Sequence, residues 1–243
     1  MSEIGAALSI EGWLTEGQAQ RLWAAASSRE RPAGAVVEIG SFRGRSTVVL
    51  ALAAGSVVAI DPHAGSDRGP QEIAPEAARG DADHAAFLAN LEGAGVADRV
   101  RHVRKFSDAA HSDVGGPLSL LYVDGAHRLG PARADVAGWG GRVVGGGTML
   151  VHDSFSSVGV TLALLTACAG AGSWRYVGRT GSLAEYSRRA VPATLAERVV
   201  DVSRHLAELP WFARNVAIKA LVLAGRRRWA ERIGLDPAAP WPY

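Results

Sequence analysis

The 243-residue sequence contains one cysteine, Cys168, and lacks any long uninterrupted hydrophobic run. One cysteine forms neither an intramolecular disulfide nor a multi-cysteine metal site, so we expect a reducing compartment. Cys168 lies in an apolar helical run and is expected to be a small core residue. A membrane-spanning helix needs about 18 apolar residues in succession, and a secretory signal needs a basic segment before an apolar one. The sequence shows neither pattern, which favours a cytoplasmic protein without membrane spans.

The chain also has little net charge, with a formal value of +2, but the charge is unevenly distributed. Residues 188–243 hold 10 Lys and Arg against 5 Asp and Glu, whereas residues 1–187 hold 16 against 19. A basic tail can contact anionic lipid, nucleic acid or an acidic substrate, but a solvated helix face has the same composition. We expect no nucleic-acid partner. With 48% hydrophobic residues, the chain can form one sizeable α/β domain plus an appendage.

Residues 35–47 combine a predicted strand, a turn and a helix start. A short β-branched run at 36–39 meets a turn with Gly40 and Gly44, and the chain then enters the apolar segment 48–54. Glycines let a ligand approach the backbone, and a helix N-terminus presents unpaired N–H groups and a partial positive charge. A nucleotide-like ligand fits this pattern, although any α/β domain can contain such a unit.

Two features bear on the type of ligand. Phe42 and Arg45 stand where a dinucleotide-binding Gly-x-Gly-x-x-Gly needs glycine, which counts against a nicotinamide cofactor. Asp61 ends the predicted strand 57–61, and its carboxylate can accept both ribose hydroxyls of an adenosine. A turn-forming aspartate before Pro62 would look the same. The sequence therefore favours a nucleoside cofactor other than a nicotinamide one.

Strand and helix patterns alternate along most of the chain, which indicates an α/β fold. We predict strands at residues 36–39, 57–61, 100–106, 118–124, 148–151, 174–177 and 183–186. We predict helices at residues 6–31 (one or two), 48–54, 83–95, 130–144, 157–170, 195–209 and 211–232. The polar stretch 63–83 has no periodicity, and such a long loop could cover a substrate. His63 could reach that substrate, although an exposed loop histidine is at least as good a reading.

Two of these strands end in acidic residues. Asp124 ends the almost wholly apolar strand 118–124, and His152 and Asp153 follow strand 148–151. These side chains face the crevice in which open α/β sheets bind ligands. Two carboxylates suit a hard cation such as Mg²⁺, and with the histidine they could also hold Mn²⁺ or Zn²⁺. Alternatively, the acids cap turns or bind the amine of a cofactor.

The first motif resembles that of the class I methyltransferases that depend on S-adenosylmethionine (SAM), whose first strand ends in acidic-x-Gly before a second glycine. Here Glu38, Gly40, Gly44 and Ser46 occupy those positions. The resemblance covers about residues 33–188. It implies a Rossmann-like, doubly wound, mostly parallel seven-stranded sheet with a terminal β-hairpin, and SAM as cofactor. The cofactor contacts that it implies are Glu38, Gly40, Ser41, Gly44, Ser46, Asp61, Ser107 and Asp124.

The later motifs resemble the metal-dependent O-methyltransferases, and within them the branch that acts on macrolide sugars and other carbohydrates. They are Tyr-Val-Asp-Gly-Ala-His at 122–127, a triple-glycine turn and Val-His-Asp at 151–153. The resemblance implies metal ligands at Asp124 and Asp153. His152 stands where catechol-type relatives carry an acid, which leaves the third ligand open. His127 falls where those relatives place a catalytic lysine, so it is the candidate general base, with a purely structural role as the alternative.

The resemblance thus implies transfer of a methyl group from SAM to a hydroxyl of a sugar or glycosylated acceptor, with Mg²⁺ or Mn²⁺ bound. A hydroxyl bound to Mg²⁺ becomes more acidic, and an imidazole with a pKa of about 6.5 can then take its proton. Aromatic residues are only 7% of the chain and few lie near the motifs, so no wall for a planar ring is evident. The alternatives are a catechol-type enzyme acting on a small aromatic, an NAD-dependent Rossmann-fold enzyme, and a non-catalytic module whose basic tail binds anionic surfaces.

We expect three parts: an N-terminal helical cap at 1–32, the SAM-binding domain at 33–188 and a basic helical extension at 189–243. In the extension, apolar residues recur at helical spacing and form one stripe. They are Leu195, Val199, Val202, Leu206 and Leu209. We therefore expect the extension to pack on the body of the protein or on a second subunit, which would make a homo-oligomer through the terminal helices.

Overall fold

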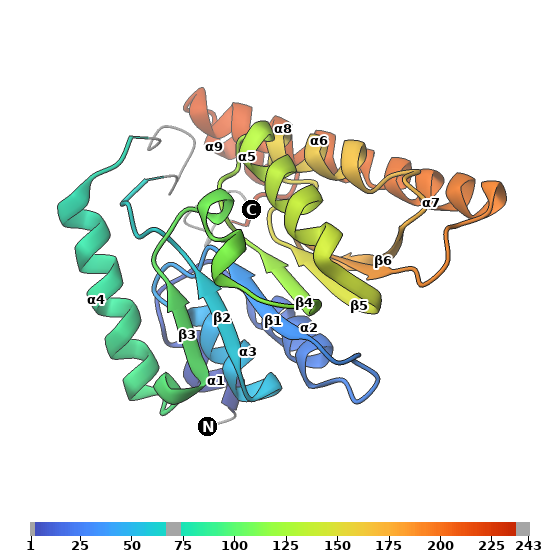
Figure 1. Cartoon of the computed structure of the whole chain (residues 1–243). Coiled ribbons are helices and arrows are strands. Elements are labelled where there is room, and N and C mark those ends of the chain that lie inside the picture. Colours follow the sequence, from blue (N-terminus) through green and yellow to red (C-terminus); the bar gives the residue numbers. More distant parts are fainter. Residues whose placement is uncertain (1–2, 67–73, 237–243) are drawn as a thin grey trace.

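The computed structural model describes residues 3–66 and 74–236, and it contains a seven-stranded sheet in the order β3-β2-β1-β4-β5-β7-β6 (Figure 1). The strands are β1 (Ala35–Ile39), β2 (Val57–Ile60), β3 (Val100–Val103), β4 (Leu118–Val123), β5 (Val143–Val151), β6 (Trp174–Thr180) and β7 (Leu183–Arg188). Strands β1 to β5 are parallel, whereas β7 runs antiparallel to both β5 and β6. The predicted seven-stranded, doubly wound sheet with its terminal hairpin is therefore confirmed.

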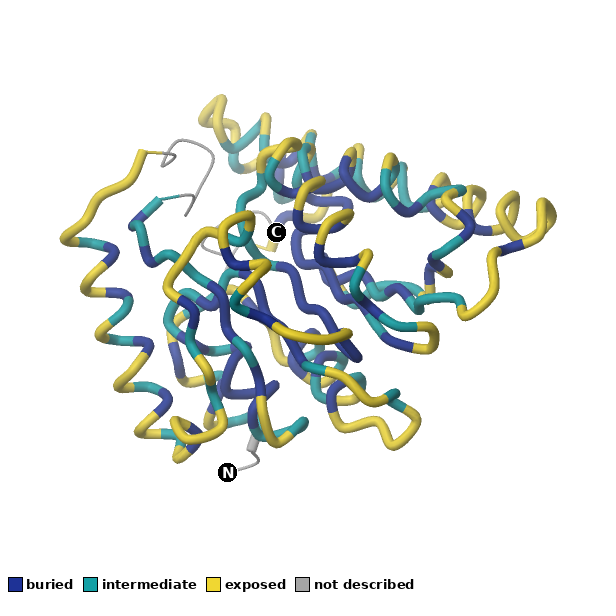
Figure 2. Tube along the Cα trace, viewed as in Figure 1, coloured by how far each residue is buried: buried dark blue, intermediate teal, exposed yellow. Residues whose placement is uncertain are grey.

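Helices cover both faces of the sheet. They are α1 (Glu3–Leu8), α2 (Glu16–Ser27), α3 (Arg45–Ala54), α4 (Ala77–Gly93), α5 (Leu129–Ala134), α6 (Val158–Ala167), α7 (Leu195–Ala207), α8 (Leu209–Leu223) and α9 (Arg227–Arg232). Helices α1 to α4 share one hydrophobic core with the sheet, and α5, α6 and part of α8 share the other (Figure 1). All residues of β4 are buried, as expected for a central parallel strand (Figure 2).

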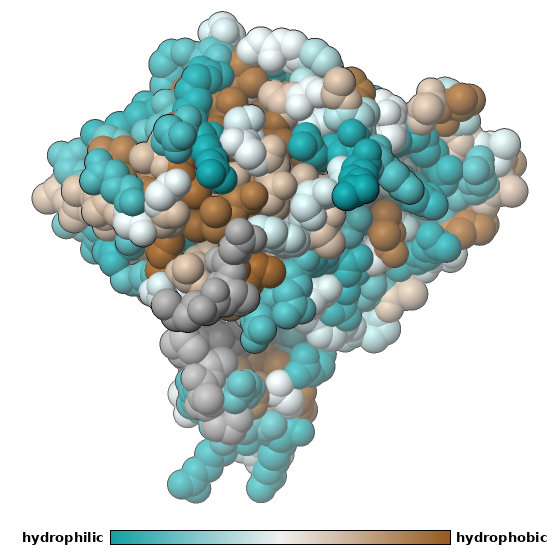
Figure 3. Space-filling model, turned by 90° about the horizontal axis from the view of Figure 1, so that it is seen from below, coloured by the Kyte–Doolittle hydropathy of each residue, from teal (hydrophilic) through white to brown (hydrophobic). Residues whose placement is uncertain are grey.

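The outer surface is mixed in character. On the face shown in Figure 3, hydrophilic side chains cover much of the area, and hydrophobic ones gather in separate groups. Among the described residues, no helix combines the length and the apolar character that crossing a membrane requires.

Several predicted bounds differ from the structure, and three of these differences involve segments that contain glycines. The predicted helix 130–144 gives way after Ala134 to a wide helical turn at Asp135–Trp139 and a tight one at Gly140–Arg142. The glycines at 145–147, predicted as a turn, lie within β5 and form a bulge, because the register against β4 shifts there. The predicted helix 211–232 is two helices, because Gly225 adopts a φ of +71° after α8.

The apolar stripe of α7 is largely exposed, so it does not pack on the body of the protein, and the alternative that it packs on a second subunit stays a prediction. Much of α7 is coloured as exposed in Figure 2 (right end). Leu195 and Val199 are 78% and 60% exposed. The helix instead buries two polar residues, Asp201 and His205. The Arg189 guanidinium donates to Asp201, and a ring nitrogen of His205 lies 3.2 Å from the Tyr186 hydroxyl. Polar contacts therefore fix α7 to the sheet and leave its hydrophobic stripe uncovered.

The turn between β1 and α3 needs glycine for a specific steric reason. Gly40 adopts a φ of +85°, and a Cβ there would lie 2.1 Å from the carbonyl oxygen of Asp124. The close approach of the backbone after β4 therefore makes glycine necessary, in addition to any approach of a ligand. Gly44, with a φ of +91°, is the residue from which α3 begins.

Glu38 joins β1 to the first turn of α3. Its side chain is fully buried, and its two carboxylate oxygens accept hydrogen bonds from the hydroxyls of Ser46 and Thr47. Burial raises the pKa of Glu38 to about 8, although the two hydroxyl donors act in the opposite direction. Between about pH 4.5 and pH 8, the folded protein therefore keeps a proton on Glu38 that the unfolded chain has already released.

We predict that Glu38→Gln removes a pH dependence of stability. Because the pKa is higher in the folded state, the free energy of unfolding of the wild type should fall as pH rises from about 4.5 to 8. The expected change is on the order of 1.4 kcal/mol per unit of pKa difference, and the glutamine variant should lack it. Urea denaturation of both proteins at several pH values measures this, with the exposed Glu92→Gln as control. Parallel pH curves for wild type and Glu38→Gln would contradict the prediction.

Candidate active site

A cavity of about 510 Å³ opens where β1, β2, β4 and β5 end. The chain reverses its direction of winding between β1 and β4, and ligands of doubly wound sheets bind at this point. The predicted site residues that line the cavity are Gly40, Asp61, Ser107, Asp124, His127, His152 and Asp153. The sheet therefore brings together residues more than one hundred positions apart in the sequence.

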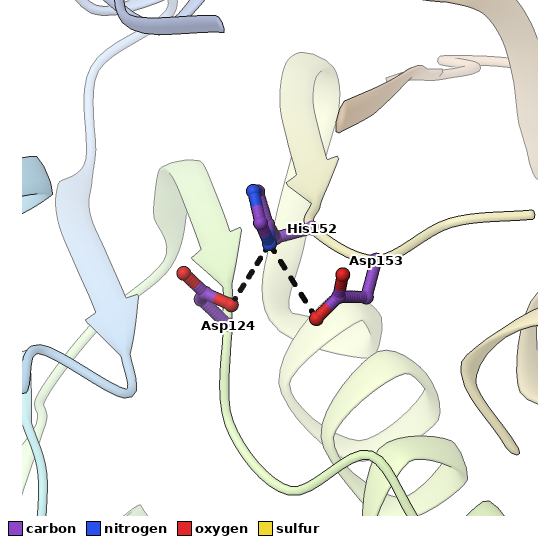
Figure 4. A group of neighbouring side chains, drawn as sticks. All are labelled: Asp124, His152 and Asp153. Atoms are coloured by element: carbon purple, nitrogen blue, oxygen red, sulfur yellow. Dashed lines mark ion pairs between the residues drawn. The ribbon is translucent and has the colours of Figure 1, made fainter. Parts of the chain in front are cut away.

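Asp124, His152 and Asp153 form one cluster at the ends of two neighbouring strands. Val123 at the end of β4 pairs with Val151 at the end of β5, so the residues that follow lie side by side. His152 Nδ1 lies 3.2 Å from Asp124 Oδ1 and 3.6 Å from Asp153 Oδ2, with its ring between the two carboxylates (Figure 4). One ligand atom from each of the three residues lies within 4.8 Å of the others.

These three residues fit a divalent cation. His152 Nδ1 is buried and has no hydrogen-bond partner, although two carboxylate oxygens face it. The other ring nitrogen, Nε2, lies 3.4 Å from the Gln18 side-chain oxygen, and a proton on Nε2 leaves the Nδ1 lone pair facing the carboxylates. Two carboxylates and a neutral imidazole are ligands of Mg²⁺, Mn²⁺ or Zn²⁺.

The charged groups of this cluster shift one another's pKa values. Burial by itself lowers the pKa of His152, but Asp124 and Asp153 raise it well above the ordinary value. Burial by itself raises the pKa of Asp153, but the neighbouring histidines hold it well below the ordinary value. Without a metal, an imidazolium supplies the positive charge between the acids. A metal ion that binds to His152 Nδ1 must therefore displace the proton of this imidazolium.

His127 reaches the same cluster from the loop after β4. Its Nε2 lies 2.6 Å from Asp153 Oδ2, and about a third of its side chain is exposed. Burial lowers the pKa of His127, but the charge of Asp153 outweighs burial and the pKa is raised. The carboxylate thereby fixes the orientation of an imidazole at the edge of the cavity, beside the possible cation ligands.

The residues predicted to contact the cofactor divide into two groups. Gly40, Asp61, Ser107 and Asp124 line the cavity, whereas Glu38, Ser41, Gly44 and Ser46 are not among its lining residues. The Asp61 carboxylate accepts hydrogen bonds from the backbone N–H groups of Phe42 and His63, at 2.9 and 2.7 Å. Each carboxylate oxygen has a further lone pair, so the ribose contact of Asp61 stays a prediction.

Several cavity residues were not predicted from the sequence. Trp13, Phe42 and Phe106 line it, so the expectation that no aromatic wall is present was wrong. Phe42 and Phe106 adjoin predicted motifs and could have been noticed, but no local signal marks Trp13. Asp135 also lines the cavity, accepts a hydrogen bond from the Ser107 hydroxyl, and has its pKa raised to about 6 by burial.

The polar stretch predicted as a substrate cover is described only in part, because residues 67–73 lie outside the described ranges. Its first residue, His63, is only 5% exposed and lines the cavity. Its Nε2 lies 2.7 Å from the carbonyl oxygen of Phe42. The reading of His63 as an exposed loop residue was therefore wrong.

Comparison with known proteins identifies the domain. Residues 37–154 match a family described as a methyltransferase domain. The O-methyltransferase NovP has a similar structure, with a TM-score of 0.59 and 14% identity over 71% of this chain and 80% of that one. The O-methyltransferase from Bacillus cereus, solved in complex with SAH, has a TM-score of 0.56 and 15% identity over 77% and 91% of the two chains.

A third similar structure is the O-methyltransferase TomG from Streptomyces achromogenes, which is involved in tomaymycin synthesis and was solved in complex with SAM. Its TM-score is 0.53, with 18% identity over 78% of this chain and 90% of that one. Because these sequence identities are low, the structural similarity shows only a shared fold. The family match identifies residues 37–154 as a methyltransferase domain. The methyltransferase match leaves no support for the alternative of an NAD-dependent enzyme. Residues 37–154 of this chain therefore form a methyltransferase domain, and the chain shares its fold with O-methyltransferases of known structure.

Proposed function

We propose that this protein is a metal-dependent O-methyltransferase that transfers the methyl group of SAM to a hydroxyl of a sugar or glycosylated acceptor. One observation carries the proposal: Asp124, His152, Asp153 and His127 meet at the cavity that Gly40 also lines. Metal-assisted O-methylation with a general base needs this convergence of cofactor, activated acceptor and base. The similar structures whose names describe O-methyltransferases support the choice of oxygen as the methyl acceptor.

Asp124, His152 and Asp153 would hold the cation, with Mg²⁺ proposed and Mn²⁺ as the alternative that the histidine nitrogen also suits. When bound, such a cation lowers the pKa of a coordinated hydroxyl and orients adjacent oxygens of the acceptor. The Tyr122 hydroxyl donates to the second oxygen of Asp124, at 2.9 Å, and so holds this carboxylate in place.

His127 is the proposed general base. As the acceptor oxygen bonds to the methyl carbon and the carbon–sulfur bond breaks, the imidazole takes the hydroxyl proton. Asp153 orients the ring through the contact with Nε2 and stabilises the imidazolium that forms. The partly exposed position of His127 at the cavity edge gives it access to an acceptor.

A small aromatic acceptor of the catechol type is the second candidate. Trp13, Phe42 and Phe106 line the cavity, and the rings of Trp13 and Phe42 lie 5.1 Å apart. Such side chains can stack on a planar ring as well as on an apolar face of a sugar. Parallel assays with glycosylated and catechol acceptors distinguish the two classes.

We predict that chelation and two substitutions each abolish most of the transfer. After EDTA treatment, or in Asp124→Asn, transfer from labelled SAM should be lost, and added Mg²⁺ or Mn²⁺ should restore only the wild type. His127→Gln should lower the rate about 100- to 10,000-fold, because a positioned base contributes about this much. The exposed His111→Gln, outside the cavity, is the control. Undiminished turnover of Asp124→Asn after chelation would remove the cation from the proposal.

We further propose a homo-oligomer through the terminal helices and a cytoplasmic location. The uncovered apolar stripe of α7 supports self-association, since large exposed apolar patches mark interaction sites. The presence of a single cysteine, which can form no intramolecular disulfide, supports a reducing compartment.

The oligomer can be tested by replacing two stripe residues at once. We expect Leu195→Glu/Val199→Glu to be monomeric in sedimentation analysis, while the wild type forms a dimer or larger assembly, because charge on this surface opposes its burial. The control replaces two exposed glutamates elsewhere, Glu30→Gln and Glu92→Gln. A monomeric wild type at every concentration would contradict self-association.

A further inference from the structure

The loop between β5 and α6 carries the cluster and is held in an unusual conformation. Residues 152–156 are all buried. Asp153 and Phe155 each adopt a φ of +56°, a left-handed conformation that residues other than glycine seldom adopt. Such residues persist only where surrounding contacts hold them in place. The contacts of this loop therefore determine where the Asp153 carboxylate lies.

Two of these contacts come from the C-terminal extension. The side-chain amide of Asn215 donates to the carbonyl of Phe155, at 3.1 Å, and the Lys219 ammonium donates to the carbonyl of Ser156, at 2.9 Å. The two residues are four positions apart in α8 and lie on one face of that helix. Asn215 is only 4% exposed, and its amide nitrogen donates to the loop while its amide oxygen accepts a hydrogen bond from Arg214.

The same loop residues contact Asp153 directly. The Ser156 hydroxyl donates to Asp153 Oδ1, at 3.3 Å, and the Ser156 N–H donates to the Asp153 carbonyl, at 3.2 Å. Lys219 thus holds Ser156, which contacts the Asp153 carboxylate. Asn215 holds the preceding residue, Phe155, in its left-handed conformation. Neither residue lines the cavity.

We propose that Asn215 and Lys219 are positioning residues for Asp153, so that the C-terminal extension sets the affinity of the cluster for its cation. This inference rests on the proposed function, because it concerns the same cation. It gives a role to a segment that lies wholly outside the matched methyltransferase domain, residues 37–154. Through its contacts with the loop, helix α8 orients a metal ligand without binding the metal itself. Metal affinity commonly depends on such contacts.

Mn²⁺ binding tests the inference without measuring activity. Paramagnetic resonance of free Mn²⁺ gives the affinity of wild type, Asn215→Leu and Lys219→Met, which keep side-chain size but lose the donor. We expect each variant to bind Mn²⁺ about 10- to 100-fold more weakly, as is typical when a second-sphere contact is lost. Lys219→Arg, which retains a donor, should recover most of the affinity. SAM binding by calorimetry should change less than about twofold.

Ile218→Ala is the matched control. Ile218 lies between the two residues on the same helix, offers no hydrogen-bonding side chain, and is buried in a cluster with Ala230 and Leu235. This variant should lose thermal stability but keep its Mn²⁺ affinity. An equal loss of Mn²⁺ affinity in Ile218→Ala would show a general effect of the helix and overturn the positioning role. Unchanged Mn²⁺ affinity in Asn215→Leu and Lys219→Met, while Asp124→Asn binds Mn²⁺ weakly, would also overturn it. Equal binding by wild type and Asp124→Asn would instead overturn the proposed cation site, and the positioning role with it.

Discussion

The parallel pairing of β4 with β5 is the constraint on which the site depends. Because Val123 and Val151 are paired, Asp124 and the His152–Asp153 dipeptide leave the sheet side by side. Two carboxylates at this separation repel each other unless a positive charge lies between them. A protonated His152 between the carboxylates supplies this positive charge. A divalent cation bound to the same carboxylates would also supply it. The same pairing places His127 within reach of Asp153.

Side chains from the N-terminal, central and C-terminal parts of the chain support this cluster. Gln18 from α2 approaches His152, Tyr122 on β4 donates to Asp124, and Asn215 from α8 holds the loop after Asp153. Buried polar groups are stable only when such partners satisfy them, so the site and its surroundings are interdependent. The N-terminal cap and the C-terminal extension are therefore parts of one structural unit around the site, although the division of the chain into three domains stays a prediction.

Much of this structure could be predicted from the sequence, because local patterns encode it. The buried run at 118–123 predicted a central strand, and the acids at strand ends predicted a shared edge. Side chains brought in from distant segments, such as Trp13, Gln18 and Asn215, could not be predicted, because no local pattern shows which elements meet. The stripe of α7 illustrates the limit: periodicity shows which residues share a face, but not whether anything covers that face.

The most direct test of the account is a crystal structure with Mn²⁺ and SAH, with anomalous diffraction used to locate the metal. We predict one anomalous peak at about 2.1 Å from the Asp124 and Asp153 carboxylates and from His152 Nδ1. SAH should occupy the same cavity, beside the turn at Gly40. A metal peak elsewhere, or none at saturating Mn²⁺, would contradict the claim that β4 and β5 build a cation site.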